Sequence, residues 1–237
     1  MASDYFDFKQ VRIYHQNCAM KVGTDSVVLG ALVNLGSNQK EMLDIGTGSG
    51  VLALMLAQRC QATITGIELD HGAFEEAHMN FKNSPWASRL SAQQISFQEF
   101  AHFASKQYEL IISNPPYFEN KKNVSILDQQ RSKARHDADL PFADLALGVT
   151  KLLAPNASFW LILPPIEAQL FLEEATKSNL VLNQKINIYS KPDKPIKRVI
   201  LELKKEASMP SESNFYLQDR NGEMSAEYKE ATSDFYL

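Results

Sequence analysis

A glycine-rich loop links an apolar strand to a helix in the first quarter of the chain. The loop, Asp44–Gly50, reads DIGTGSG, follows the apolar run Met42–Ile45 and leads into the apolar helical stretch Gly50–Arg59. Closely spaced glycines permit a tight turn and close approach of a ligand to the backbone. The next run, Ala62–Ile67, is β-branched and ends at Glu68, where doubly wound sheets carry an acid that binds ribose hydroxyls. This order of elements predicts an α/β fold with a ligand site at the loop.

The loop differs from two common nucleotide-binding motifs. A dinucleotide fingerprint needs a third glycine at the position of Val51, and the Lys-Ser/Thr pair of a phosphate-binding P-loop is absent. The alternative is a simple glycine turn beside a solvated acid. The order of the elements, which is strand, loop, helix, strand and acid, argues against this alternative. Asp44 ends the first strand, where its carboxylate is placed to meet a cationic or amine-bearing ligand.

A second motif, Asn-Pro-Pro-Tyr, follows another buried strand. The strand Glu109–Ser113 (ELIIS) stops at Asn114, and Pro115, Pro116 and Tyr117 come next. Prolines fix the backbone and remove donors, which leaves carbonyls free to accept, while tyrosine offers a flat face with a polar tip. The four residues predict a rigid acceptor pocket for a planar group that carries an NH₂. A proline turn that merely ends a strand is the alternative.

Apolar runs alternate with amphipathic stretches along the rest of the chain, which is typical of a parallel sheet covered by helices. Helices are expected at His71–Lys82, Leu140–Leu153 and Ile166–Ser178, and strands at Ala157–Leu163, Val181–Tyr189 and Arg198–Leu203. Phe215–Leu217 predicts a further short strand, and Ser225 is placed to cap a last short helix.

Composition and charge exclude several classes of protein. Hydrophobic residues make up 44% of the 237 positions, enough for a core, and no apolar run approaches the roughly 20 residues of a spanning helix. The two cysteines are far apart, which excludes a disulfide framework and a cysteine zinc site and favours a cytoplasmic setting. The net charge is −4, yet residues 121–136 and 185–205 are locally basic, so they are candidates for a phosphate-binding face. A solvated surface of mixed charge is the alternative, and charge alone favours it.

Several separate strings agree in order with one protein family. They are FKQ at 8–10, CAMKVGTDSVVLGA at 18–31, LALMLAQR at 52–59, SPWASR at 84–89 and LIISNPPY at 110–117. With DIGTGSG and the acid of GIELD, they resemble the bacterial tRNA (adenine-N6)-methyltransferase family, whose members modify the adenine beside the anticodon of one valine tRNA. The resemblance covers about residues 8–205.

The resemblance implies a fold and a division of the chain. The fold would be that of class I (Rossmann-like) methyltransferases, a doubly wound, mostly parallel, seven-stranded sheet with an antiparallel last strand. Residues 1–30 would be an extension that packs on the cofactor site, 31–205 the methyltransferase domain, and 206–237 a tail of one strand and one short helix docked on the domain.

The resemblance also implies S-adenosylmethionine as the cofactor and no metal. Residues expected at the methionine end of the cofactor are Lys21, Gly23, Thr24 and Asp25. The loop around it would be Asp44, Gly46, Gly48 and Gly50, the ribose would be held by Glu68 beside Leu69, and the adenine would lie by Ser96 and Phe97. Asn114 would lie at the cofactor as well as at the substrate.

The implied reaction is direct displacement at the sulfonium methyl by an adenine amine. Asn114 and the Pro115 carbonyl would accept the two amine protons, and Tyr117, beside Pro116, would stack on the base once it is flipped from the anticodon loop. Residues expected to bind tRNA phosphates are Lys121, Lys122, Arg131, Lys133, Arg135, His136, Lys194, Lys197 and Arg198. Neither a membrane nor an obligate protein partner is expected.

Other functions fit the same residues. Methyltransferases of protein glutamine amides or of guanine N2 use a similar Asn-Pro-Pro-Tyr pocket, and the former would need no basic face. A non-catalytic RNA-binding module on the same fold is the alternative outside enzymes. Intact Asp44, Glu68 and Asn114 argue against that module, because a pure binder would need none of them.

Overall fold

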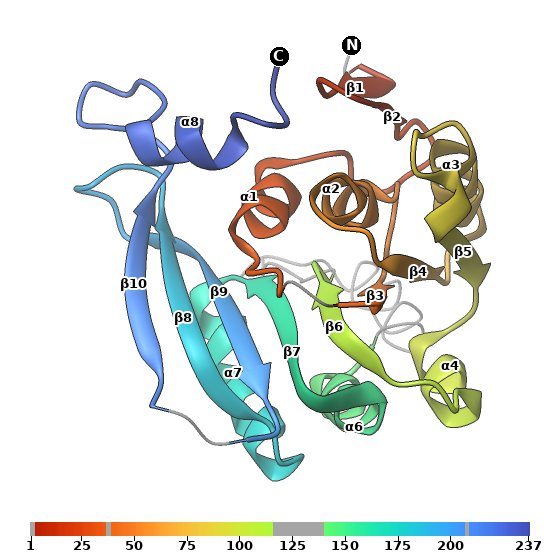
Figure 1. The fold of residues 1–237 in the computed structure, drawn as a ribbon. Coiled ribbons are helices and arrows are strands. Elements are labelled where there is room, and N and C mark those ends of the chain that lie inside the picture. Colours follow the sequence, from red (N-terminus) through yellow and green to blue (C-terminus); the bar gives the residue numbers. More distant parts are fainter. Residues whose placement is uncertain (1–2, 37–38, 116–139, 207–208) are drawn as a thin grey trace, which may run out of the picture.

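A twisted sheet forms the centre of the molecule in the computed structural model, which describes residues 3–36, 39–115, 140–206 and 209–237 (Figure 1). Its strands are β3 (Glu41–Ile45), β4 (Thr63–Glu68), β5 (Leu90–Gln94), β6 (Tyr108–Ser113), β7 (Leu153–Leu163), β8 (Val181–Tyr189), β9 (Ile196–Lys204) and β10 (Ser211–Tyr216). Across the sheet they lie in the order β10-β8-β9-β7-β6-β3-β4-β5. Strand β9 is antiparallel to both of its neighbours, and all other pairs are parallel.

The doubly wound, mostly parallel sheet with an antiparallel seventh strand confirms the expected fold class. The expected number of seven strands is one too low, because β10 adds an eighth at the edge. It pairs in parallel with β8, from Ser211 opposite Gln184 to Tyr216 opposite Tyr189. Most of β10 is polar and exposed, and Phe215 is its buried anchor, so the apolar pattern marked only the end of this strand.

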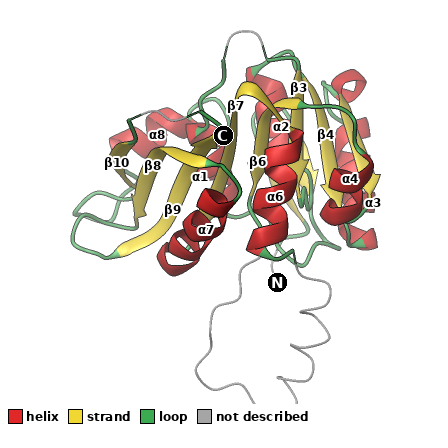
Figure 2. Ribbon diagram, turned by 90° about the horizontal axis from the view of Figure 1, so that it is seen from below, coloured by secondary structure: helices red, strands yellow, loops and turns green. Residues whose placement is uncertain are grey.

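Helices cover both faces of the sheet. One face carries α1 (Thr24–Leu32), α2 (Val51–Arg59), α3 (His71–Lys82) and the C-terminal α8 (Ala226–Thr232). The other carries α4 (Phe97–Phe103), α6 (Phe142–Leu152) and α7 (Pro165–Lys177), which lie along the same face in Figures 1 and 2. Each face has its own apolar cluster. No helix in the described part of the chain is long and apolar enough to cross a membrane.

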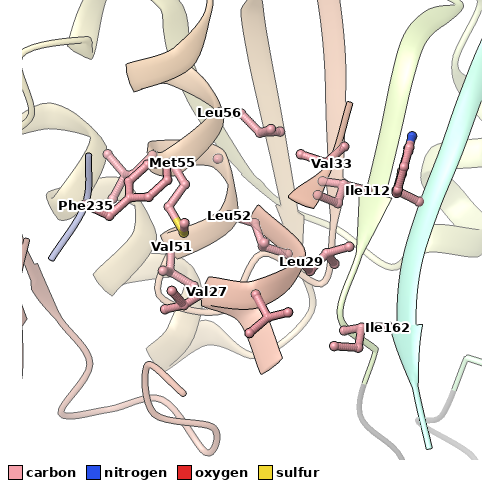
Figure 3. Packing of buried hydrophobic residues seen from close by; sticks show 14 of the residues in the cluster. Val27, Leu29, Val33, Val51, Leu52, Met55, Leu56, Ile112, Ile162 and Phe235 are labelled. Carbon is pink, nitrogen blue, oxygen red and sulfur yellow. The ribbon is translucent and has the colours of Figure 1, made fainter. Parts of the chain in front are cut away.

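The first cluster joins segments that are distant in sequence. Figure 3 shows Leu29 of α1 and Leu52 of α2 packed toward Ile112 of β6, with Phe235 from the C-terminus beside α2. These side chains are at most 3% exposed, and full burial of such a side chain contributes about 1.5–3 kcal/mol. The C-terminal residue Phe235 is therefore part of the core, where it belongs to the same apolar cluster as α1 and α2.

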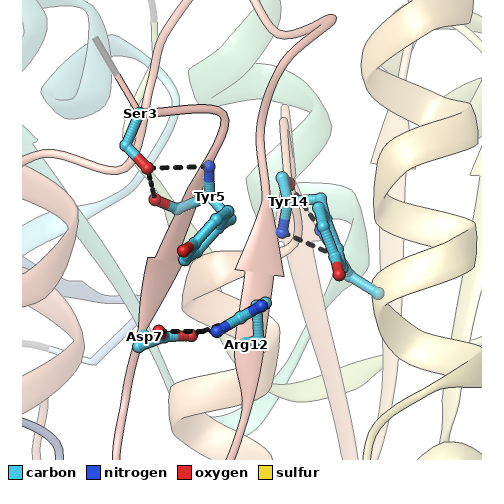
Figure 4. A network of polar contacts seen from close by, with 6 residues as sticks. Ser3, Tyr5, Asp7, Arg12 and Tyr14 are labelled. Carbon is cyan, nitrogen blue, oxygen red and sulfur yellow. Dashed lines mark hydrogen bonds and ion pairs between the residues drawn. The ribbon is translucent and has the colours of Figure 1, made fainter.

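A short hairpin of β1 (Tyr5–Asp7) and β2 (Arg12–Tyr14) lies next to the C-terminus. Figure 4 shows its polar contacts, in which Arg12 donates to both carboxylate oxygens of Asp7 at 2.6 and 2.9 Å. This pair is exposed, so it adds little to stability. The hairpin is fixed instead by Asn80 of α3, whose side chain exchanges two hydrogen bonds with the backbone of Tyr14.

The junction between α6 and β7 differs from the sequence expectation. Helix α6 spans Phe142–Leu152 rather than Leu140–Leu153, and β7 begins at Leu153 rather than at Ala157. The ladder explains the early start, because Leu153 already pairs with Tyr108 before an irregularity brings Ser158 opposite Leu110. Pro155 therefore lies inside the strand, at the irregularity, where its missing N–H is tolerated.

Candidate active site

Three adjoining clefts open at the carboxyl ends of β3, β4 and β6. The first, of about 550 Å³, has Phe97 and Leu69 in its wall, the second, of about 190 Å³, lies over the glycine loop, and the third, of about 270 Å³, reaches Arg198. The first two share Gly46, Glu68 and Asp70, and the last two share Met20, Lys21, Ser26 and Asn114. Ligands of open α/β sheets bind at this edge, so the clefts form one continuous candidate site.

The glycine loop borders the first two clefts in a conformation that favours glycine. Gly46, Gly48 and Gly50 have φ of +67°, +55° and +82°, values that other residues rarely adopt. A Cβ atom at Gly46 or Gly48 would meet nothing within 4 Å, whereas at Gly50 it would lie 2.4 Å from the Phe81 ring. The first two glycines thus leave open space for a ligand, and Gly50 lets α2 begin against α3.

Glu68 lies between the first two clefts and organises the backbone around them. Its Oε2 accepts from the Gly48 N–H at 2.9 Å, and its Oε1 accepts from the N–H groups of Leu69 and Asp70 at 2.8 and 3.0 Å. A carboxylate has about four lone-pair sites, so capacity remains for a hydroxyl donor. The acid expected at the ribose therefore also ties the tip of the glycine loop to the end of β4.

Asp44 does not line any of the three clefts. It is fully buried, and its Oδ2 accepts from the Thr47 hydroxyl at 2.6 Å and from the Ala53 N–H at 3.3 Å, while its Oδ1 has no hydrogen-bond partner in the described residues. Burial raises its pKa to about 7. Asp44 therefore lies beneath the glycine loop and joins it to α2. This geometry favours a structural role over the direct ligand contact that its position at the end of the strand suggested.

The buried Asp44 should make the stability of the cofactor-free protein depend on pH. Its folded pKa of about 7 exceeds the usual value of 3.8, so the folded state holds the proton more tightly and stability falls as pH rises from about 4 to 7. Between pH 5 and pH 8 the loss should be roughly 2–4 kcal/mol. Denaturant unfolding should show this loss in the wild type and a smaller one in Asp44→Asn. Equal pH dependence of the two proteins would contradict the assignment.

Asn114 follows β6 and lines the second and third clefts. Asn114 is 8% exposed, its Nδ2 donates to the Ser26 hydroxyl at 2.9 Å, and its Oδ1 has no hydrogen-bond partner among the described residues. An unpaired buried acceptor is costly unless a ligand satisfies it, so the amide is ready to accept a proton donor. Pro115 lines the first cleft. Pro116 and Tyr117 lie outside the described residues.

Ser26 is a site residue that the sequence did not indicate. It lies buried in the first turn of α1 and its hydroxyl fixes which way the Asn114 amide faces. A serine in a first helical turn is common for local reasons, so nothing marked this one. The contact spans 88 positions of sequence, and only the fold brings the two residues together.

Removal of the Ser26 hydroxyl should impair turnover more than cofactor binding. In Ser26→Ala the Asn114 amide loses the partner that orients it, and we expect kcat to fall by about tenfold with the affinity for the cofactor unchanged. Ser26→Thr retains the hydroxyl and should recover most of the rate. The measurement is steady-state kinetics with calorimetry of cofactor binding. An alanine variant with wild-type kcat, or a threonine variant as slow as alanine, would contradict this role.

The residues expected at the ribose and at the adenine of the cofactor line the first cleft. Leu69 is half exposed there, and Phe97 is buried at the start of α4. The Ser96 hydroxyl caps α4, since it accepts from the Glu99 N–H and donates to the Glu99 carboxylate. Asp70, which no motif in the sequence indicated, lines the first two clefts and caps α3 by accepting from the Ala73 N–H.

The residues expected at the methionine end divide between two clefts. Lys21 lines the second and third, but its ammonium donates to the carbonyls of His15 and Gln16 and so holds the loop before α1. Of these three clefts, Gly23, Thr24 and Asp25 line the third and not the first two. Within the described ranges no group of three or more His, Cys, Asp and Glu side chains is arranged to hold a metal ion.

The basic residues expected to bind RNA are only partly described. Lys197 and Arg198 line the third cleft beside Asn114, and Lys194 is exposed on the turn before them. The Arg198 guanidinium donates to the Asp25 carboxylate at 2.7 Å, which joins β9 to the first turn of α1. The other expected residues lie outside the described residues; they are Lys121, Lys122, Arg131, Lys133, Arg135 and His136.

Comparison with known proteins gives consistent results. The profile of the methyltransferase small domain family matches residues 18–137. A protein of Bacteroides fragilis named tRNA1(Val) (adenine(37)-N6)-methyltransferase is 36% identical, over 100% of this chain and 99% of its own. A protein of the same name from Phocaeicola vulgatus is 39% identical with the same coverage.

Solved structures agree on the fold at low identity. The crystal structure of a predicted O-methyltransferase from Agrobacterium tumefaciens has a TM-score of 0.70 at 14% identity and covers 89% of this chain and 96% of its own. A glycopeptide N-methyltransferase in complex with S-adenosyl-L-methionine has a TM-score of 0.56 at 12% identity, with coverage of 79% and 90%. At such identities the likeness concerns the fold alone.

Proposed function

The chain belongs to the tRNA1(Val) (adenine(37)-N6)-methyltransferase family, and from that premise we propose that it methylates the N6 amine of the adenine 3′ of the anticodon in a valine tRNA. The methyl donor would be S-adenosylmethionine, without a metal, and a tRNA substrate implies a cytoplasmic location. The observation that carries the proposal is the buried Oδ1 of Asn114, which has no partner within the described part of the chain and lines the clefts beside the glycine loop.

The residues present fit a nucleoside-containing cofactor. Open space above Gly46 and Gly48 leaves room for it against the backbone. Glu68 retains acceptor capacity for ribose hydroxyls, and Phe97 supplies an apolar wall in the first cleft for the base. We therefore assign the first two clefts to the cofactor, with the adenosine end at Phe97 and the methionine end toward Lys21. The third cleft, beyond Asn114, is assigned to the substrate base.

The protein's contribution is to orient a weak nucleophile. The lone pair of an adenine amine is delocalised into the ring, so the nitrogen must be turned before it can attack. Asn114 Oδ1 would accept one amine proton and the Pro115 carbonyl the other, which points the lone pair toward the cofactor. S-adenosylmethionine would supply an electrophilic methyl group at that place. Such fixed acceptors act through orientation and preorganised electrostatics, with no covalent enzyme intermediate.

The test is methyl transfer from labelled S-adenosylmethionine to total bacterial tRNA that lacks the modification. Nucleoside mass spectrometry should find N6-methyladenosine, and separation of the tRNAs should place the label in one valine tRNA. N2-methylguanosine, or label in protein glutamine instead of RNA, would replace the proposal with one of the two related activities. Cofactor binding without any methylated product would favour a non-catalytic RNA-binding module.

A further inference from the structure

A fourth cleft, formed largely by the C-terminal tail, lies next to the proposed substrate cleft. It measures about 270 Å³ and is lined by Thr24, Ser190, Lys197, Leu217, Gln218, Met224 and Tyr228. Two of these residues, Thr24 and Lys197, also line the cleft that holds Asn114. We propose that this tail cleft binds a nucleotide that flanks the methylated adenine in the substrate RNA. The inference rests on the proposed function.

The position of the tail cleft suits a flanking nucleotide. A flipped base must enter the cleft with Asn114, and the RNA backbone continues from it along the protein surface. Strands β8 and β10 are parallel to β7 and end at Tyr189 and Tyr216, so the segments that follow them lie at the same edge of the sheet as Asn114. The tail cleft is therefore beside the reactive site, and Asn114 is not among its lining residues.

The walls of the tail cleft are held by backbone contacts. The ladder of β8 and β10 continues past both strands, because the N–H of Gln218 donates to the Ser190 carbonyl at 3.0 Å. Ser225 closes the tail turn, since its N–H donates to the Leu217 carbonyl and its hydroxyl donates to the Tyr216 carbonyl and caps α8. Gln218 also forms a bridge with Met224. The tail is thus a structured wall.

The side chains of the tail cleft favour a ligand that carries both an anionic group and an apolar group. Among the described residues that line it, Lys197 is the one with a charged side chain. Within the described part of the chain, the side chains of Thr24, Ser190, Lys197 and Gln218 form no hydrogen bond or ion pair. Leu217 and Met224 provide apolar surface, and Met224 is 37% exposed. A phosphate with its sugar and base matches this set, because the polar side chains can donate hydrogen bonds to the phosphate oxygens and the apolar atoms can contact the base.

The test is a change of charge at Gln218, measured by fluorescence anisotropy with a labelled anticodon stem-loop RNA. Gln218→Glu places a carboxylate among the phosphate donors and should weaken RNA binding by about tenfold. Gln218→Lys should bind at least as tightly as the wild type, which separates a charge effect from a folding defect. Gln61→Glu makes the same charge change in the exposed loop before β4, at the opposite edge of the sheet, and should bind as the wild type does.

Equal RNA affinity of Gln218→Glu, Gln61→Glu and the wild type would overturn the tail cleft assignment. Weakening by both Gln218 variants would also overturn it, because loss of structure would then explain the effect. The assay needs no catalysis, so it is separate from the test of methyl transfer. The protein could bind RNA in a manner that depends on the charge at position 218 and yet methylate no adenine. That result would support RNA binding by the tail cleft and would reject the proposed function.

Discussion

Replacement of Asn114 with alanine should reduce methyl transfer to tRNA by about 10²–10³-fold while the affinity for S-adenosylmethionine changes by less than about threefold. The buried Oδ1 of Asn114 has no partner in the ranges that the structure describes, so among those residues the truncation of this side chain leaves only the Ser26 hydroxyl without its partner. What disappears is the acceptor that orients the amine. The loss should therefore fall on kcat, because the acceptor acts on the reacting nitrogen.

The controls for this variant separate orientation from folding. Asn114→Asp keeps an acceptor in the same place, and the Ser26 hydroxyl can turn to donate to it, so this variant should retain more activity than alanine. Calorimetry gives the cofactor affinity, and thermal unfolding checks that both variants fold. Parallel loss of cofactor binding and activity in Asn114→Ala would make Asn114 a structural or cofactor residue. Wild-type kcat would exclude it from the reaction.

The sequence predicted those elements whose apolar residues follow a regular period. The run ELIIS and the β-branched run before Glu68 became β6 and β4, because strands buried on both faces must be apolar throughout. Strand β5 (LSAQQ) was missed, since it is an edge strand with mostly half-buried or exposed residues. Its identity comes from pairing with β4, which no local pattern encodes.

The candidate site was predictable where a motif carries its own geometry. Glycines with positive φ and an acid at the end of a strand are local features, so the loop and Glu68 could be placed from sequence. Contacts between segments that are distant in sequence could not be predicted in this way. Ser26 reaches Asn114, and Arg198 pairs with Asp25 over 173 positions. The tail contributed a fourth cleft for the same reason, since its residues join the edge only through the ladder with β8.

Replacement of Glu68 should weaken binding of S-adenosylmethionine by about 100-fold or more in Glu68→Ala. Two losses combine in this variant. The ribose would lose its acceptor, and the N–H groups of Gly48, Leu69 and Asp70 would lose the carboxylate that fixes them. Each lost contact of this kind costs about 1–3 kcal/mol, and 1.4 kcal/mol corresponds to a tenfold change in affinity. Isothermal titration of the cofactor-free protein is the measurement.

Glu68→Gln should give an intermediate loss that reports on the loop alone. Glutamine can present its single oxygen to the N–H groups of Leu69 and Asp70, which both use Oε1, but its NH₂ then faces the Gly48 N–H, donor against donor. The tip of the glycine loop would relax while β4 stays intact. Glu75→Gln removes the same charge from an exposed position on α3 and should bind as the wild type does. Cofactor affinity in Glu68→Ala within threefold of the wild type would show that the acid at the end of β4 does not hold the cofactor, and the first two clefts would need another ligand.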